Sequence, residues 1–178
     1  MKKILTALAM LVIFPAALAD DKVKVGDYDI LQLCTSAEKI RLVVHNPRPD
    51  AIEIGLTHER IKNVSESRLR AARIYDPEGA EFLQIATNAI KPTLISGEQI
   101  GDGQTIAVSY ELGFNKMILD LDVNEFGYAQ TWSRGSILMA DANFTVQAIS
   151  KAVDKFVNEF LWVNESKRCR EVTGRDSE

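Results

Sequence analysis

Few residues of the types that most often do chemistry occur in this chain. It has two cysteines, Cys34 and Cys169, and two histidines, His45 and His58. A cysteine with a histidine as its base could act as a nucleophile. In an oxidising compartment, an even pair of cysteines more often forms a structural disulfide. We therefore expect Cys34 and Cys169 to be bridged, with a catalytic cysteine as the alternative.

One acidic segment has the spacing that opens a calcium-binding loop. Asp120, Asp122 and Asn124 match the first ligand positions, but Glu125 stands where the loop needs glycine and Thr131 where it needs glutamate. Aspartate and asparagine are also common in hairpin turns, because they tolerate left-handed backbone and cap their own turns. The segment favours a turn over a calcium site.

A second segment begins like the helix of a zinc protease. His58 and Glu59 fit that motif, but Lys62 occupies the position of the second histidine. The sequence contains neither a glycine-rich phosphate loop nor a Gly-x-Ser-x-Gly elbow. No spacing among the 25 acidic residues singles out a catalytic carboxylate pair. We therefore expect no metal and no cofactor, and we lean against an enzyme.

Arg68 occupies an unusual place in an expected helix. It falls at the centre of the apolar side, next to Val64, Ser65 and Ala72. One interpretation is that its stem lies on the sheet while its head reaches water. The other is a mostly buried guanidinium held by a carboxylate or by carbonyls, as a structural key or as part of a binding pocket.

Trp162 raises a similar question near the end of the last expected helix. Continuing the helical turn from Phe160 places the indole among Lys155 and Glu159, on the face opposite the core. The helix could bend or end near Leu161, so that the indole packs onto its own domain. Alternatively, Trp162 is an exposed anchor for a partner, since aromatic residues with a polar handle are favoured at interfaces.

The beginning of the chain looks like an export signal. Lys2 and Lys3 precede an apolar run, and the small residues of an A-x-A site end at Ala19. This pattern is typical of a secretory signal peptide over residues 1–19. The residue directly after the expected cleavage site is Asp20 rather than a cysteine, which disfavours a lipid anchor. We expect a periplasmic or secreted protein that begins at Asp20.

Length and charge exclude several classes of protein. The chain has 178 residues, 46% of them hydrophobic, with 21 lysines and arginines against 25 acidic residues. This is enough for the core of one domain, expected over 20–178 with a short frayed C-terminal tail. The slightly acidic balance argues against a nucleic-acid partner. No apolar stretch reaches the ~18 residues of a membrane span.

Periodicity predicts the elements that must position these residues. Helix-period patterns predict one amphipathic helix capped by Thr57 and ending near Tyr75, and another capped by Asp141 or Asn143. Alternating or apolar runs predict strands at 28–33, 39–45, 81–90, 104–119 and 126–134, of which 104–119 is one long strand or two strands joined at Gly113. The resulting order is β-β-α-β-β-β-α. It favours a single α+β domain, a largely antiparallel sheet with both helices packed on one face.

Three segments carry a resemblance to known proteins. Glu66–Asp76, Thr131 and Trp132 followed by Gly135, and Phe156–Asn164 resemble small exported bacterial proteins of uncharacterised function. The element order is similar to periplasmic α+β modules of curli, flagellar and exopolysaccharide export assemblies, which act by protein contact. This implies an exported, non-enzymatic protein whose partner is another envelope protein or a second copy. A module binding small ligands or glycans, and a small hydrolase without a recognisable motif, are the alternatives.

Overall fold

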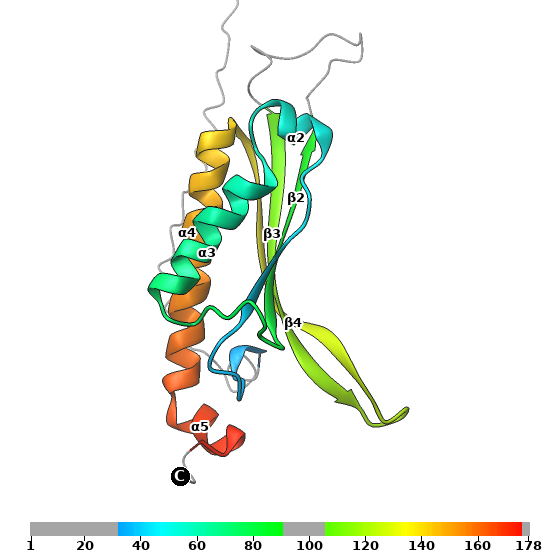
Figure 1. Ribbon diagram of the computed structural model, residues 1–178, viewed down its shortest axis with the longest axis vertical. Coiled ribbons are helices and arrows are strands. Elements are labelled where there is room, and N and C mark those ends of the chain that lie inside the picture. Colours follow the sequence, from blue (N-terminus) through cyan, green and yellow to red (C-terminus); the bar gives the residue numbers. More distant parts are fainter. Residues whose placement is uncertain (1–31, 91–105, 176–178) are drawn as a thin grey trace, which may run out of the picture.

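The structure is a computed structural model that describes residues 32–90 and 106–175 (Figure 1). It is a single α+β domain with a four-stranded mixed sheet, in the order β1-β2-β3-β4. The elements are β1 (Arg41–Val44), α2 (Pro49–Glu53), α3 (His58–Ala71), β2 (Phe82–Ile90), β3 (Ile106–Asp120), β4 (Glu125–Ala140), α4 (Ala142–Glu165) and α5 (Lys167–Thr173). The predicted fold class is confirmed.

The sheet combines an antiparallel meander with one parallel strand. β2, β3 and β4 pair antiparallel in sequence order, whereas β1 pairs parallel with β2. The parallel pairing follows from α2 and α3, which lie between these strands and return the chain to the same end of the sheet. Strand 28–33 was expected before β1. Of that segment, Gln32 and Leu33 are helical in the structure, and the rest lies outside the described residues.

α3 begins where the sequence predicts and ends earlier. The Thr57 side chain caps it by accepting a hydrogen bond from the Arg60 backbone N–H at 3.3 Å. The helix ends at Ala71 rather than near Tyr75. Arg73 has left-handed backbone (φ 63°), and Tyr75 forms a β-bridge with Ile40 beyond it. The bridge between Tyr75 and Ile40, next to β1, therefore takes the place of the last helical turn that was expected for α3.

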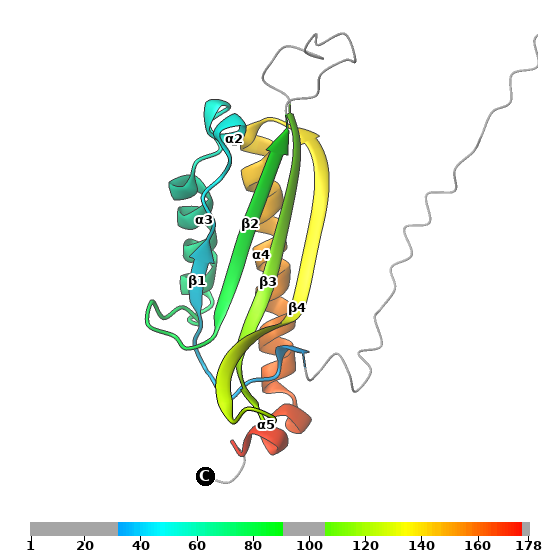
Figure 2. The same ribbon diagram turned by 90° about the vertical axis from the view of Figure 1, so that its right-hand side faces the viewer.

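α4 is the longest helix described and lies along the same face of the sheet as α3 (Figure 2). Asp141 caps it, accepting a hydrogen bond from the Phe144 N–H at 2.7 Å. Its buried side contributes Phe156 and Phe160 to an aromatic cluster that also contains Phe114 and Trp132, with ring centroids 5.2–5.7 Å apart. Among the described helices, none has the length and apolarity needed to cross a membrane.

Candidate functional site

The most unusual surface of the domain is the end of the β3–β4 hairpin. β2 begins at Phe82, which pairs with Asn115 of β3, so the later residues of β3 pair only with β4. This two-stranded extension, residues 116–129, is called the hairpin arm below. Figure 1 shows the arm swinging away from the helices and from the rest of the sheet.

A β-bulge marks the point where the arm leaves the sheet. Phe114 pairs with Trp132, but the next residue, Asn115, pairs with Gln130. Thr131 is thus an extra residue on β4 and has no partner in the ladder. Bulges bend a strand and increase its twist, which accounts for the change in direction at the base of the arm.

The tip of the arm is the turn that the acidic segment favours. The Asp122 N–H donates to Asp120 Oδ1 at 2.9 Å, and Asn124 has left-handed backbone with φ 53°. Both features belong to the turn chemistry of short polar side chains. Asp120 and Glu125 pair across the strands that the turn connects.

Apolar side chains cover the arm, and the Phe82 ring of β2 contacts one of them, Tyr128, with the ring centroids 5.1 Å apart. Seven are between 41% and 83% exposed: Met117, Ile118, Leu119, Leu121, Val123, Phe126 and Tyr128. Met117 lies opposite Tyr128 and Leu119 opposite Phe126, so these four share one side of the ribbon. The exposed carboxylates of Asp120, Asp122 and Glu125 surround the tip. The result is an apolar surface with an acidic border.

The base of the arm is fastened to the segment Gln32–Thr35. Lys116 Nζ donates to the Cys34 carbonyl at 2.9 Å, and Thr131 Oγ1 donates to the Gln32 carbonyl at 2.6 Å. These contacts come from both strands of the hairpin. They fix the direction in which the arm leaves the domain.

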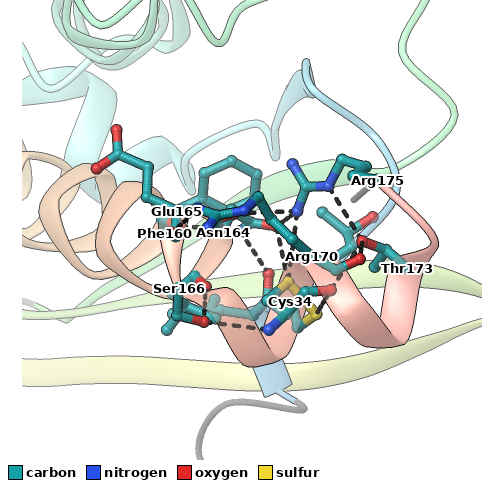
Figure 3. The surroundings of a disulfide bond; sticks show 12 residues. Cys34, Phe160, Asn164, Glu165, Ser166, Arg170, Thr173 and Arg175 are labelled. Carbon is teal, nitrogen blue, oxygen red and sulfur yellow. Dashed lines mark hydrogen bonds between the residues drawn. A yellow bond between two sulfur atoms is a disulfide. The ribbon is translucent and has the colours of Figure 1, made fainter. Parts of the chain in front are cut away.

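A disulfide holds the same segment to the C-terminal helices (Figure 3). Cys34 and Cys169 are bridged, with their Cα atoms 5.5 Å apart, within the range that disulfides require. The pairing expected from the sequence is thus present in the structure. Because the bridge occupies both sulfur atoms, neither cysteine is available in this structure as the nucleophile of the alternative interpretation.

Asn164 reinforces this attachment and was not identified from the sequence. Its Oδ1 accepts a hydrogen bond from the Thr35 N–H at 3.0 Å, and its Nδ2 donates to the Leu33 carbonyl at 2.9 Å. Its Oδ1 also faces Arg175 at 3.1 Å (Figure 3). Asn164 is 7% exposed. The amide therefore satisfies backbone groups that would otherwise be buried without partners.

Two ionisable groups lie in the same region. Burial raises the pKa of Glu81 above its ordinary value, although the neighbouring Thr35 and Lys116 act in the opposite direction. Burial lowers the pKa of Lys116, against the attraction of Glu81. Desolvation disfavours the charged form of each group and dominates in both cases.

Arg68 is not the buried guanidinium that one interpretation of the sequence required. Its side chain is 49% exposed, and its Nε lies 3.1 Å from Ser150 Oγ and 3.4 Å from an Asp154 carboxylate oxygen, both on α4. It lines an open cavity of about 420 Å³ between α3 and α4. The apolar stripe of α3 extends to the edge of the helix pair, so Arg68 reaches water there while its head contacts α4.

Trp162 lies on the exposed face of α4 with 56% of its surface accessible. The helix does not end near Leu161, because it continues to Glu165. The neighbouring Glu159 accepts a hydrogen bond from the Trp132 indole N–H at 3.2 Å and pairs with Arg134 at 3.3 Å, so it is engaged with β4. Trp162 is placed where a partner could reach it, and its role as a contact stays a prediction.

The outer face of the sheet, away from the helices, contains a shallow cavity of about 360 Å³. Its lining combines polar and apolar residues and includes Ser109, Glu111, Ser133 and Ile137. This is where the ligand-binding alternative would place a small molecule. No imidazole or thiol lines this cavity.

Comparisons with solved structures give only weak likenesses. No family model and no curated protein sequence matches the chain. It is similar to the dodecamer of a PelC variant from Paraburkholderia phytofirmans, with a TM-score of 0.36 and 16% identity, over 73% of this chain and 89% of that one. It is also similar to the rare lipoprotein B from Shewanella oneidensis, with a TM-score of 0.24 and 11% identity, over 68% of this chain and 91% of that one. At these scores neither likeness bears on function.

Proposed function

We propose that this chain is an exported, non-enzymatic protein that binds another protein through the hairpin arm. The observation that carries the proposal is the exposure of seven apolar side chains on a two-stranded ribbon. Exposed apolar patches of this kind mark interaction sites. A two-stranded ribbon is also only marginally stable in water by itself. Docking against a partner would bury the apolar side of the arm and so stabilise the two-stranded ribbon.

The charge of the arm indicates the chemistry of its partner. Asp120, Asp122 and Glu125 surround the apolar tip, and the one cationic side chain of the arm, Lys116, points inward to Cys34. A surface that combines basic and apolar residues would complement the tip, whereas an anionic lipid surface would repel it. The preferred partner is therefore a protein with a basic border around an apolar groove.

The disulfide supports the export part of the proposal. Bridged cysteines persist in oxidising compartments such as the bacterial periplasm and are rare in the cytosol. In this chain the Cys34–Cys169 bridge lies close to the base of the arm. The bridge would therefore keep the arm in a fixed orientation where export delivers the protein. The signal peptide over 1–19 lies outside the described residues and stays a prediction.

The proposal is tested by crosslinking from the tip of the arm. A photoreactive residue replaces Leu121, which is 83% exposed, in protein produced by an export-competent bacterial host. The matched control carries the same group at Ile52, which is 49% exposed on α2. We expect a discrete adduct from position 121 and none from position 52. Equal adducts from both positions, or none from either, would contradict the proposal.

A substitution then shows whether the adduct depends on the apolar side of the arm. Phe126→Ser should remove most of the adduct formed from position 121. Its effect on the free energy of unfolding should be below ~0.5 kcal/mol, because the ring is already 71% exposed. Trp162→Ala in the same assay tests the predicted contact on α4. Loss of the adduct with an unchanged melting temperature would make Trp162 part of the contact surface.

A further inference from the structure

β4 is an edge strand of unusual length. It has 16 residues, and the strand order places it at one end of the sheet, paired on one side with β3. Within residues 32–90 and 106–175, no other strand pairs with its outer side. Such an edge presents a row of backbone N–H and C=O groups to any strand that approaches.

The hydrogen bonds of β1 show which backbone groups of the sheet point in which direction. The His45 N–H donates to the Ile85 carbonyl at 2.9 Å, so Ile85 directs its backbone toward β1. Successive residues of a strand direct these groups to opposite neighbours. Ala86 therefore faces β3, where its partner in the register is Glu111.

The same alternation reaches the outer edge of β4. Because Glu111 faces β2, Tyr110 faces β4, and its partner there is Ser136. The backbone N–H and C=O groups of Ser136 thus point toward β3. Gly135, Ile137 and Met139 direct their N–H and C=O groups outward, away from the sheet.

This part of the edge lacks the features that keep edge strands apart. Proline, lysine and other charged residues are common protections, but the run Gly135–Ala140 contains none of them. Ile137 is 80% exposed and Met139 is 59% exposed. The nearest charge on the strand, Arg134, pairs with Glu159 on the helix side. The edge therefore offers unused backbone groups and apolar side chains together.

We propose that this edge pairs with the same edge of a second copy of the chain, antiparallel about a two-fold axis at Ile137. The row of backbone groups requires a strand as its occupant, not a lipid or a small molecule. The formal net charge is −4, so two copies repel unless they meet at an uncharged segment. Gly135–Ala140 is such a segment. The hairpin arm is not an uncharged segment, because its three carboxylates would face the same three carboxylates of the second copy.

The side chains on the outer face of the sheet also fit this pairing. With the axis at Ile137, Ile137 lies opposite Ile137 of the partner subunit, and Met139 lies opposite Gly135 of the partner subunit. Gly135 is required within one copy too, because a Cβ there would lie 2.8 Å from the Tyr110 carbonyl oxygen. Because Gly135 has no side chain, nothing at that position obstructs the methionine that would lie opposite it. Cross-strand apolar pairs of this kind stabilise antiparallel ladders.

The test measures the mass of the purified protein by sedimentation equilibrium as its concentration is varied. We expect a dimer for the unmodified protein. Ile137→Pro should raise its dissociation constant by about ten-fold or more, because proline removes an N–H that only the second copy would use. Ile90→Ser is the matched control, since Ile90 is 62% exposed but lies on β2. It should leave the dissociation constant unchanged.

Two further variants and one matched control keep the test decisive. Met139→Lys places a charge on the edge and should also weaken the dimer, even if Ile137→Pro does not fold. Ile137→Cys should form an intermolecular disulfide across the two-fold axis under mild oxidation, and Ser133→Cys should not. A monomer at every concentration, or a dimer that tolerates both Ile137→Pro and Met139→Lys, would overturn the proposal. These results are separate from crosslinking at the arm, because they use the purified protein alone.

Discussion

The guanidinium of Arg68 lies at the rim of the α3–α4 groove, half in water. Exposed ion pairs contribute roughly 0–1 kcal/mol, because water and salt screen them. We therefore expect Arg68→Ala to lower the free energy of unfolding by less than ~1 kcal/mol, about as much as Arg70→Ala, which removes an exposed pair with Glu66. Urea unfolding of both variants measures this. A loss of ~3 kcal/mol or more for Arg68→Ala alone would mean that the guanidinium is buried in solution.

Glu81 gives the domain a specific pH dependence. Burial raises the pKa of Glu81 in the folded protein, so the folded state binds this proton more tightly than the unfolded state does. The protonated Glu81 side chain therefore contributes to the free energy of unfolding at pH values below the ordinary carboxyl pKa. That contribution is lost as the pH rises through the raised pKa that Glu81 has in the folded protein. Glu81→Gln, which cannot ionise, should therefore lose less stability than the unmodified protein between acidic and neutral pH.

Urea unfolding across that pH range checks the expectation for Glu81. Glu59→Gln, an exposed change in the first turn of α3, is measured in parallel as the control substitution. If Glu81→Gln and the unmodified protein show parallel profiles, the carboxyl of Glu81 is solvated. The lowered pKa of Lys116 acts in the alkaline range, where stability is gained as the pH rises toward the ordinary lysine value.

At the level of elements, the polarity pattern predicts most of the sheet and both main helices. The alternation in β2 and the stripe of α4 are local properties, and each agrees with what the fold buries. The hairpin arm could not be predicted in this way. Residues 117–119 are as apolar as a half-buried strand, and their exposure arises because β2 begins only at Phe82. That depends on the relative lengths of strands far apart in the sequence.

Asn164 was missed for a similar reason. An asparagine near the end of an amphipathic helix has no distinctive pattern, and its partners Leu33 and Thr35 are about 130 residues away in the sequence. The only signal was its position: the helix continues its apolar stripe through Phe160 to Asn164, one turn later. A polar residue on that stripe predicts a buried hydrogen bond. It does not identify the partner.

The attachment made by Asn164 can be measured. Asn164→Ala leaves buried backbone groups of Leu33 and Thr35 without partners, which should cost about 2–3 kcal/mol in the free energy of unfolding. Asn158→Ala, at an exposed position on the same helix, should change it by less than ~0.5 kcal/mol. Both values come from denaturant unfolding of the oxidised protein. Similar effects for the two variants would mean that water replaces the amide at position 164.

For the whole molecule, export and disulfide formation can be tested in one measurement. Protein recovered from an export-competent host should begin at Asp20, because the small residues at 17 and 19 suit signal peptidase. Its intact mass should be lower by two hydrogen atoms than that of the reduced form, because Cys34 and Cys169 are bridged. Exported protein that retains Met1, or a mass that reduction does not change, would contradict these expectations.

The attachment of Gln32–Thr35 to α4 and α5 also constrains when the chain can finish folding. Cys34 and Thr35 find their partners at Cys169 and Asn164, and the disulfide joins residues 135 apart in the sequence. A chain that crosses a membrane from its N-terminus exposes residues 32–35 long before residues 164–169 follow. If the chain is exported as proposed, this end of the domain would stay open throughout translocation. Premature folding there would then not oppose passage through the membrane, and the native disulfide would form only after the last helices had crossed.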